Sequence, residues 1–543
     1  MSEQNTTSHE QAKPSVARST ALMSACTLVS RATGFIRTWA MAFALGNTVM
    51  AAGFSLANNL PNMIYELVAG GVLSTAFLPI YLQQRNQSSG EAASAYASNL
   101  LSIALVLLGG ISLLASIFAP QVMVTQSLFS SASEETVTAA VWFFRFLSFE
   151  ILFYGISAIF GGILNAEREF FWPAISSVFM NIVAIVGFFG YPFISAADAT
   201  AGTTWLGATN LLSIAVMAFV QLPALRRTGV RFRFRIDLHG PGLAETLRLA
   251  LPAIACTAIN LVGLSVMNSC ALHVAANGPA SVGYAWMWYQ FPYGVLGVAL
   301  STAMFTEMSD AVSRGETERF KEHLLAGLTT TLMLIIPMAA LLFACSFQLI
   351  GLYSAGRFTP DDIAPIAMLL KGWAINLPIY ASYMYVYRVF SALKDMKTVA
   401  ICNGILTVAQ VLLYMLFTGV IAIPGFGGFG LVGIALGDIC FYSLMLLTLL
   451  TILRSRLDNL KVASVFTAGA KVLVASVVGA VVACLIAWGL DQVLDTGYML
   501  WSFVALLITG VAGLGVIVAM CRLLHVDEIS RMIGALRAKL LRR

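Results

Sequence analysis

Long apolar stretches, each of about 20 residues or more, recur along the whole chain from Ala21 to Met520, with short polar breaks between them. A helix of about 20 residues crosses the ~30 Å hydrocarbon core of a bilayer. Hydrophobic residues make up 59% of the chain and charged residues only 10%, whereas soluble domains carry about 25% charged residues. The sequence therefore predicts an all-α protein that crosses a membrane many times.

Fourteen apolar segments can be placed along the chain. Their expected ranges are 21–45, 50–83, 97–118, 137–164, 171–193, 204–224, 246–273, 281–306, 324–353, 363–390, 398–422, 430–453, 463–488 and 499–521. The amino terminus is polar and contains Glu3 and Glu10, so we interpret residues 1–20 as a cytoplasmic tail and not as a signal peptide. With this orientation, 25 of the 31 lysines and arginines fall on the cytoplasmic side and only Arg357 falls outside, as the positive-inside rule requires.

The two halves of the chain repeat one another. The motif GVLSTA from Gly71 matches VALSTA from Val298 at an offset of 227, and LNAEREFF from Leu164 aligns with LKDMKTVA from Leu393 at an offset of 229. The offset of 229 also places Gly34 over Gly263 and Asn181 over Gln410. This repeat predicts two six-helix lobes related by a pseudo-two-fold axis along the membrane normal, which can rock about a central cleft.

The repeat leads to an expected domain organisation. The expected units are a cytoplasmic tail at 1–20, an amino-terminal lobe at 21–224, a basic cytoplasmic linker at 225–245, a carboxyl-terminal lobe at 246–455, a two-helix appendage at 456–521 and a basic amphipathic cytoplasmic tail at 522–543. The stretch from Arg226 to Arg248 alone holds six arginines. These arginines either contact anionic lipid headgroups or serve only as a topology determinant and linker.

Ionisable side chains within the apolar segments are candidates for the transport site, because a charge inside the bilayer is costly. Arg31 and Arg37 lie ~120° apart around the first helix and ~9 Å apart along it, so both can border one cavity. Guanidinium groups bind phosphate oxygens in pairs, so these arginines predict binding of a diphosphate. The acids Glu66, Glu150 and Asp438 either bind a coupling cation, Na⁺ or H⁺, or form structural ion pairs such as Arg31 with Glu66.

The aromatic residues Trp286, Trp288 and Tyr289 either line the same cavity or simply pack between helices. Enzymatic chemistry and direct use of ATP are not expected, because the sequence contains no GxxxxGK[ST], HExxH or GxSxG motif. The eight cysteines form no CxxC pair, so neither disulfides nor a metal site is expected. Apart from a coupling cation, we expect no cofactor.

Several motifs resemble those of a known family. They are Ser30–Arg31, Gly34–Arg37, Leu60–Asn62, Gly71–Pro79, Tyr289–Pro292 and Gly297–Ala303. Together they resemble the MurJ (MviN) lipid II flippases of the multidrug/oligosaccharidyl-lipid/polysaccharide exporter superfamily. The resemblance implies a cationic central cavity in which Arg31 and Arg37 contact the diphosphate of an undecaprenyl-linked precursor, with a lipid-tail groove formed by the last two segments.

The same resemblance implies alternating access driven by membrane potential or ions, in the cytoplasmic membrane of a bacterium that builds peptidoglycan. The expected partners are the anionic polyprenyl-diphosphate lipid, membrane lipids and cell-wall synthesis proteins, and not nucleic acid.

Several charged positions of the family are replaced in this chain. Acidic or basic residues of the family fall on Ala52, Asn59, Gly70 and Met287, while Glu66 stands where a basic residue is usual. Asn59 is therefore a further candidate for the cavity lining. The replacements leave two other functions open, a cation-coupled exporter of drugs or other polyprenyl-linked oligosaccharides, and a scaffold for envelope assembly that transports nothing.

Overall fold

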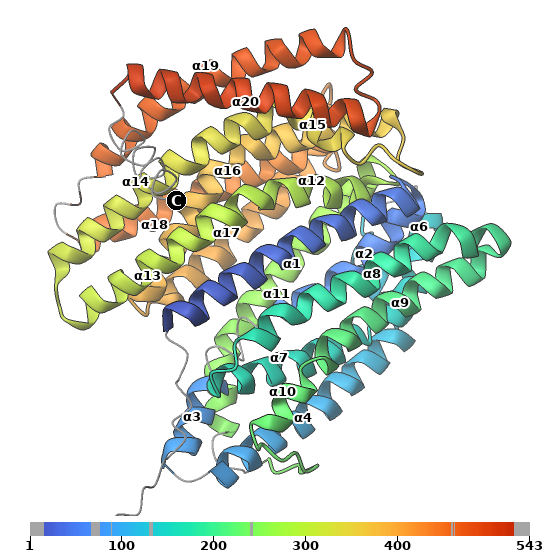
Figure 1. Cartoon of the computed structure of the whole chain (residues 1–543), viewed down its shortest axis with the longest axis vertical. Coiled ribbons are helices and arrows are strands. Elements are labelled where there is room, and N and C mark those ends of the chain that lie inside the picture. Colours follow the sequence, from blue (N-terminus) through green and yellow to red (C-terminus); the bar gives the residue numbers. More distant parts are fainter. Residues whose placement is uncertain are drawn as a thin grey trace, which may run out of the picture.

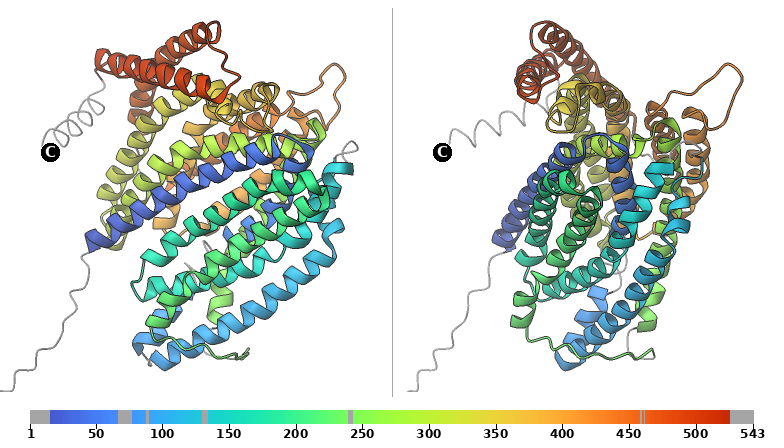
Figure 2. Two further views of the ribbon diagram at one scale, coloured as in Figure 1. Left: turned by 45° about the vertical axis from the view of Figure 1, so that its right-hand side comes forward. Right: turned by 90° about the vertical axis from the view of Figure 1, so that its right-hand side faces the viewer.

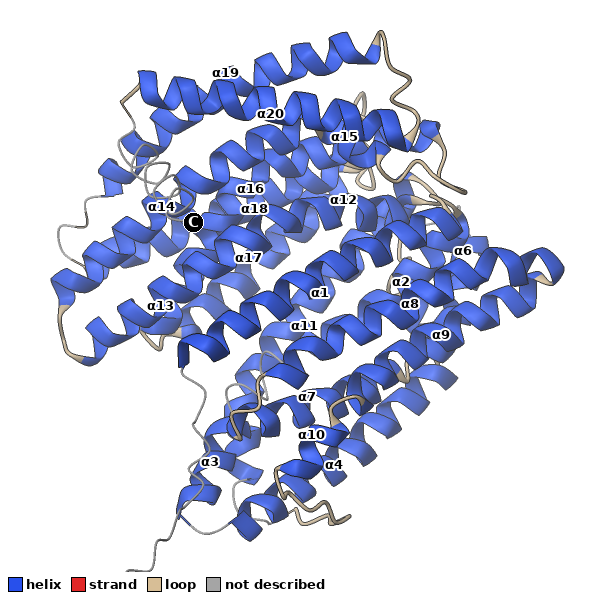
Figure 3. Cartoon of the chain, viewed as in Figure 1, coloured by secondary structure: helices blue, strands red, loops and turns tan. Residues whose placement is uncertain are grey.

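The computed structural model describes residues 16–66, 77–87, 90–129, 134–238, 243–457, 460 and 462–525. Within these ranges the chain forms helices joined by loops (Figure 3). The first group of helices comprises α1 (Val16–Leu45), α2 (Val49–Glu66), α3 (Leu78–Gln87), α4 (Gly90–Ile117), α5 (Ala119–Val124), α6 (Glu134–Leu147), α7 (Glu150–Ala166), α8 (Phe171–Ala197), α9 (Ala199–Phe219) and α10 (Leu222–Arg227).

The remaining helices follow the basic linker. They are α11 (Leu243–Val274), α12 (Gly278–Pro292), the π-helix η2 (Tyr293–Gly297), α13 (Val298–Ser313), α14 (Thr317–Ala344), α15 (Ser346–Gly351), the 3₁₀-helix η3 (Pro360–Asp362), α16 (Ile363–Ala392), α17 (Met396–Phe417), α18 (Val432–Arg456), α19 (Val462–Asp491) and α20 (Met499–Leu523). The all-α fold expected from the sequence is thus confirmed for the described part of the chain.

Wherever the structure describes them, the expected apolar segments coincide with a helix or with consecutive helices, and residues 67–76 of the segment 50–83 lie outside the described part. Among the described residues, nine helices are individually long and apolar enough to cross a membrane, and the number rises to eleven when two bent pairs each count as one span. One bent pair is α6 with α7, at 41°, and the other is α11 with α12 and η2, at 119°. Fourteen crossings are compatible with this arrangement, but the number stays a prediction.

The helices gather into two groups that lie side by side (Figure 1). In the first lobe, which we define as α1–α10, α1 packs on α8, α8 on α9 and α2 on α6. In the second lobe, α11–α18, the packing pairs are α11 with α17, α17 with α18, and α12 and α13 with α16. The helices α19 and α20 pack on each other and on α14, along the outer edge of the second lobe (Figure 2).

Equivalent residues of the repeat occupy equivalent places in the two lobes. A Cβ atom added to Gly34 of α1 would lie 3.8 Å from Nδ2 of Asn181 on α8, and one added to Gly263 of α11 would lie 3.6 Å from Oε1 of Gln410 on α17. In each lobe, a glycine of the first helix therefore faces an amide of its packing partner. These contacts support the offset of 229 found in the sequence.

One part of the repeat alignment was wrong. The helices α7 and α16 both end in a turn that contains one residue with a left-handed backbone. This residue is Arg168 (φ 64°) after α7 and Lys394 (φ 58°) after α16. In both turns a backbone N–H reaches back five residues, from Glu169 to Leu164 and from Asp395 to Phe390. The local offset is 394 − 168 = 226, not 229, because the sequence alignment there followed leucines and not the turn geometry.

Polar side chains fix where several helices begin. Asp198 caps α9 by accepting a hydrogen bond from the backbone N–H of Thr200 at 2.8 Å, and Asp395 caps α17 through Thr398 at 3.3 Å. A side-chain oxygen in such a position satisfies one of the unpaired N–H groups at a helix start. These caps set the tight turns that return the chain between neighbouring helices.

Two ends of the helical bundle must be distinguished. The end where α1 begins is here called the Val16 end, and the end that holds the turn between α1 and α2 is called the Asn47 end (Figure 1).

Candidate functional site

Arg31 of α1 lies between the two lobes. Its side chain is partly exposed, and its guanidinium lies so close to Gly294 of η2 that a Cβ atom on Gly294 would overlap it. Gly294 is therefore the residue of the second lobe that makes room for this arginine.

A second arginine approaches the same place from another helix. Tyr293, next to Gly294, lies within electrostatic range of both Arg31 and Arg388. Arg388 is an exposed residue near the end of α16, with its guanidinium carbon 6.0 Å from the centre of the Phe305 ring. Positive groups from both lobes thus act on one phenol, and guanidinium groups can bind an anion with several oxygens.

Sequence reasoning missed Arg388 because it was counted among the cytoplasmic loop residues. Its position inside the expected segment 363–390 was the signal that could have identified it.

Arg37 acts on a residue of the first lobe. It acts electrostatically on Glu150, a fully buried residue that begins α7 at the bend after α6. One oxygen of Glu150 accepts a hydrogen bond from Nδ2 of Asn210 at 2.6 Å, and the other has no hydrogen-bond partner among the described residues. Arg31 and Arg37 therefore act on residues of different lobes, so a single cavity bordered by both stays a prediction.

Asp438 of α18 is the buried carboxylate of the second lobe. It is 4% exposed and accepts hydrogen bonds from Trp373 Nε1 at 2.8 Å, from Gln410 Nε2 at 3.2 Å and from the Tyr414 hydroxyl. Within the described part of the chain, no lysine or arginine forms an ion pair with it.

The three candidate aromatic residues of α12 have different surroundings. Tyr289 is 1% exposed, lies 5.5 Å from the Trp373 ring and accepts a hydrogen bond from Asn376 at 2.9 Å. It belongs to the core of the second lobe, so the packing interpretation describes its place in this structure, and a cavity-lining role stays a prediction. Trp286 is partly exposed, and Trp288 packs edge-on against Phe35 of α1 at 4.8 Å.

The remaining candidates lie on α2. Asn59 donates a hydrogen bond across the lobes to Oδ1 of Asn268 on α11 at 3.5 Å. Glu66 is the last residue of α2, and its side chain lies outside the described part of the structure. Gly70, the motif at Gly71–Ala76 and most of both expected tails also lie outside it.

The lobes are tied together at the Asn47 end. The backbone carbonyl of Asn47 accepts from Asn277 at 3.0 Å, and its side chain accepts from Ser281 at 3.1 Å and donates to Asp362 at 3.3 Å. The Tyr284 hydroxyl donates to the carbonyl of Gly46 at 2.6 Å. We call this group of residues, 46, 47, 277, 281, 284 and 362, the latch.

Gly46 allows the latch to close. Its backbone is left-handed (φ 66°), and a side chain there would collide with the carbonyl of Arg357. The backbone N–H of Arg357 donates to Phe43 at 3.0 Å, and its guanidinium lies 5.5 Å from the Tyr191 ring of the first lobe. Among the described residues of α2, Asn59 is the one furthest from the Asn47 end that forms a hydrogen bond to the other lobe, with Asn268.

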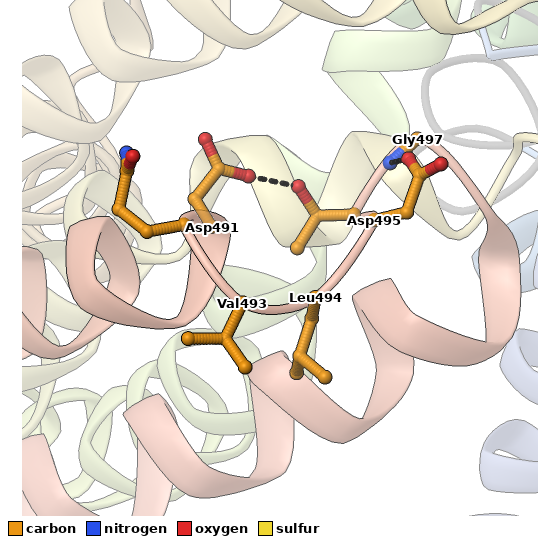
Figure 4. Close-up of a pocket in the computed structure, with 7 residues that line it drawn as sticks. Asp491, Val493, Leu494, Asp495 and Gly497 are labelled. Carbon is orange, nitrogen blue, oxygen red and sulfur yellow. Dashed lines mark hydrogen bonds between the residues drawn. The ribbon is translucent and has the colours of Figure 1, made fainter.

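A separate pocket lies on the loop between α19 and α20 and is lined by residues 491–497 (Figure 4). Its two carboxylates have partners within the loop, since Asp491 accepts from Thr496 and Asp495 accepts from the backbone of Gly497. The pocket lies outside the region between the lobes, and its chemistry does not suggest a transport site.

The fold and the charges between the lobes identify the class of this protein as a multi-pass membrane transporter built from two helical lobes. The chain belongs to the lipid II flippase MurJ family, whose model matches residues 41–509. This match confirms the family resemblance found in the sequence.

Relatives and solved structures agree with this assignment. A probable lipid II flippase MurJ of Rhizobium meliloti (strain 1021) is 27% identical over 72% of this chain and 73% of its own length. The lipid II flippase MurJ of Burkholderia cenocepacia is 26% identical over 72% of this chain and 77% of its own length. A solved lipid II flippase MurJ in an inward closed conformation shares the fold with a TM-score of 0.75 at 22% identity, over 94% of this chain and 100% of that chain.

A transporter of another family has a similar fold. A multidrug resistance MATE family transporter, solved in an inward-facing conformation, has a TM-score of 0.67 at 17% identity, over 80% of this chain and 99% of that chain. At this identity the likeness concerns the fold alone.

Proposed function

We propose that the chain is a lipid II flippase of the bacterial cytoplasmic membrane that works by alternating access. The observation that carries the proposal is Arg31 against Gly294, between two lobes that the described residues join at the Asn47 end. A diphosphate carries several oxygens that guanidinium groups bind well. Family membership supports the same substrate.

The two ends of the bundle can be assigned from charge. The six arginines from Arg226 to Arg248 extend from the last turn of α10 to the beginning of α11, at the Val16 end. We therefore assign this end to the cytoplasm, together with both chain termini. The latch then faces the other side of the membrane. In this state the substrate would enter from the cytoplasm and meet Arg31 and Arg388 before the latch opens.

Depletion of the protein in its own host tests this function. We expect lipid II exposed on the outer leaflet to fall while total lipid II, measured in parallel, accumulates. Unchanged exposure, with a second flippase excluded, would contradict the proposal and favour the drug exporter.

We further propose that Asp438 carries the coupling cation, Na⁺ or H⁺. It is buried and receives three hydrogen bonds, but within the described structure it has no basic ion-pair partner. A charged carboxylate inside the membrane costs free energy, so an acidic residue in such a place is commonly a functional group. Glu150 is a weaker candidate, since Arg37 acts on it and a single amide donates to it.

Asp438→Asn should therefore remove the dependence of transport on a Na⁺ or pH gradient in proteoliposomes. Glu150→Gln serves as the matched control, because it also neutralises a fully buried acid, and it should keep that dependence. Asp438→Asn with normal gradient dependence would refute the assignment, provided that both variants elute as folded protein.

A further inference from the structure

The segment after α10 lies as an extended strap across α4. We define the strap as residues 230–238. Ser98 donates to the carbonyl of Arg231 at 3.2 Å and accepts from the N–H of Arg233 at 3.2 Å. Ser102 accepts from the N–H of Arg235 at 3.0 Å.

Asn99 holds the far part of the strap. It accepts from the N–H of Asp237 at 2.7 Å and donates to the carbonyl of the same residue at 2.8 Å. Every second residue of the strap therefore turns its backbone toward α4.

This register separates the side chains of the strap into two rows. In an extended chain successive side chains point to opposite faces, so the odd-numbered arginines form one row and the even-numbered apolar residues form the other. Phe232 packs against Phe160 of α7 at 5.8 Å. Beyond it, Phe234, Ile236 and Leu238 are 73%, 48% and 69% exposed.

The basic row carries positive charge that the described residues neutralise only in part. Arg235 pairs with Asp237 at 2.9 Å, but no acid of the described chain forms an ion pair with Arg231 or Arg233. Both arginines are exposed. The strap thus presents a row of cations beside a row of apolar side chains.

The helix under the strap lies at the periphery of the protein. Only 17% of its apolar stretch is buried within the protein, so most of α4 faces lipid. The span Glu91–Ile117 has 27 residues and is therefore ~40 Å long, about 10 Å more than the hydrocarbon core. Ser98 to Ser102 lie roughly 10–17 Å from its start, near the boundary between headgroups and acyl chains.

We propose that the strap is a binding site for anionic phospholipids of the leaflet at the Val16 end. Arg231 and Arg233 bind headgroup phosphates, while Phe234, Ile236 and Leu238 insert among the upper acyl chains. The apolar row favours a phospholipid as the ligand over a soluble anion. The position on the lipid-facing helix α4 favours a phospholipid over the transported substrate, which we place near Gly294. The strap thereby fixes the depth of the first lobe in the bilayer.

The test uses the full-length protein in nanodiscs of phosphatidylcholine, with and without phosphatidylglycerol. Native mass spectrometry should show bound phosphatidylglycerol enriched on the wild type, and the variant R231Q/R233Q/R235Q should bind at least about ten-fold less. Hydrogen exchange of the strap amides should slow with phosphatidylglycerol in the wild type and not in the variant.

The matched control is R314Q/R319Q/K321Q, which removes the same charge from arginines and a lysine that already pair with acids. It should keep the lipid enrichment. Equal loss in the control, or no enrichment on the wild type, would overturn the proposal. So would loss of transport by the strap variant with lipid binding unchanged, because its arginines would then serve the substrate.

Discussion

Arg31→Ala is expected to abolish complementation of a flippase-depleted strain, and Arg388→Ala to reduce transport by about 10- to 100-fold. A hydrogen-bonded pair with a charged group contributes about 1.5–3 kcal/mol, and each 1.4 kcal/mol corresponds to about ten-fold in affinity. Arg31 has the larger effect because it lies between the lobes against Gly294. Growth of the depleted strain and lipid II exposure on the outer leaflet measure the loss.

Three further variants sharpen this test. Arg31→Lys keeps the charge but not the forked geometry of the guanidinium, so it should rescue only partly. Gly294→Ala leaves Arg31 in the chain but pushes its guanidinium aside, and it should also impair transport. Arg319→Ala, in an exposed group of ion pairs, is the control and should grow normally. Full growth of Arg31→Ala at normal expression would eliminate the proposed diphosphate site.

Closing the latch covalently is expected to stop transport completely and reversibly. In the double variant Asn47→Cys with Ser281→Cys, the thiols replace two side chains whose oxygens are 3.1 Å apart, and a disulfide needs the Cα atoms of the two residues to lie within about 7 Å. Oxidation should trap the lobes together at the Asn47 end, and a reductant should restore lipid II transport in proteoliposomes. The mechanism requires this because the substrate leaves only when the latch opens.

A disulfide inside one lobe is the matched control. Ser30 and Ser177 join α1 to α8 within the first lobe, with their hydroxyl oxygens 2.8 Å apart. The variant Ser30→Cys with Ser177→Cys should keep its transport after oxidation. Normal transport by the oxidised latch variant would mean that the lobes do not separate at this end, and the rocking mechanism would have to be abandoned.

The apolar segments and the repeat could be read from sequence because both depend on local pattern. Hydrophobic length predicts a spanning helix without knowledge of its neighbours, and Gly34 and Gly263 recur because the same helix pair packs in each lobe. The turn after α7 was misaligned by three residues, since its register depends on the backbone of Arg168 and not on residue type.

The site was harder to predict because it depends on contacts between lobes. Arg388 looks like one more basic residue near a loop until Tyr293 is placed beside it. The latch consists largely of neutral polar residues such as Asn47 and Tyr284, which carry no charge signal in a sequence. The motif at Tyr289 shows the same limit, since Phe291 is exposed and Tyr289 is buried, and only the fold distinguishes these two aromatic residues.

The helices α19 and α20 pack closely on α14 and α15 of the second lobe. This attachment has a practical consequence. A fluorophore on Tyr498, which is 63% exposed directly before α20, would move with the second lobe. A second fluorophore on Phe193, which is 80% exposed on α8, would ride with the first lobe. Energy transfer between the two would then report each opening of a single molecule in real time.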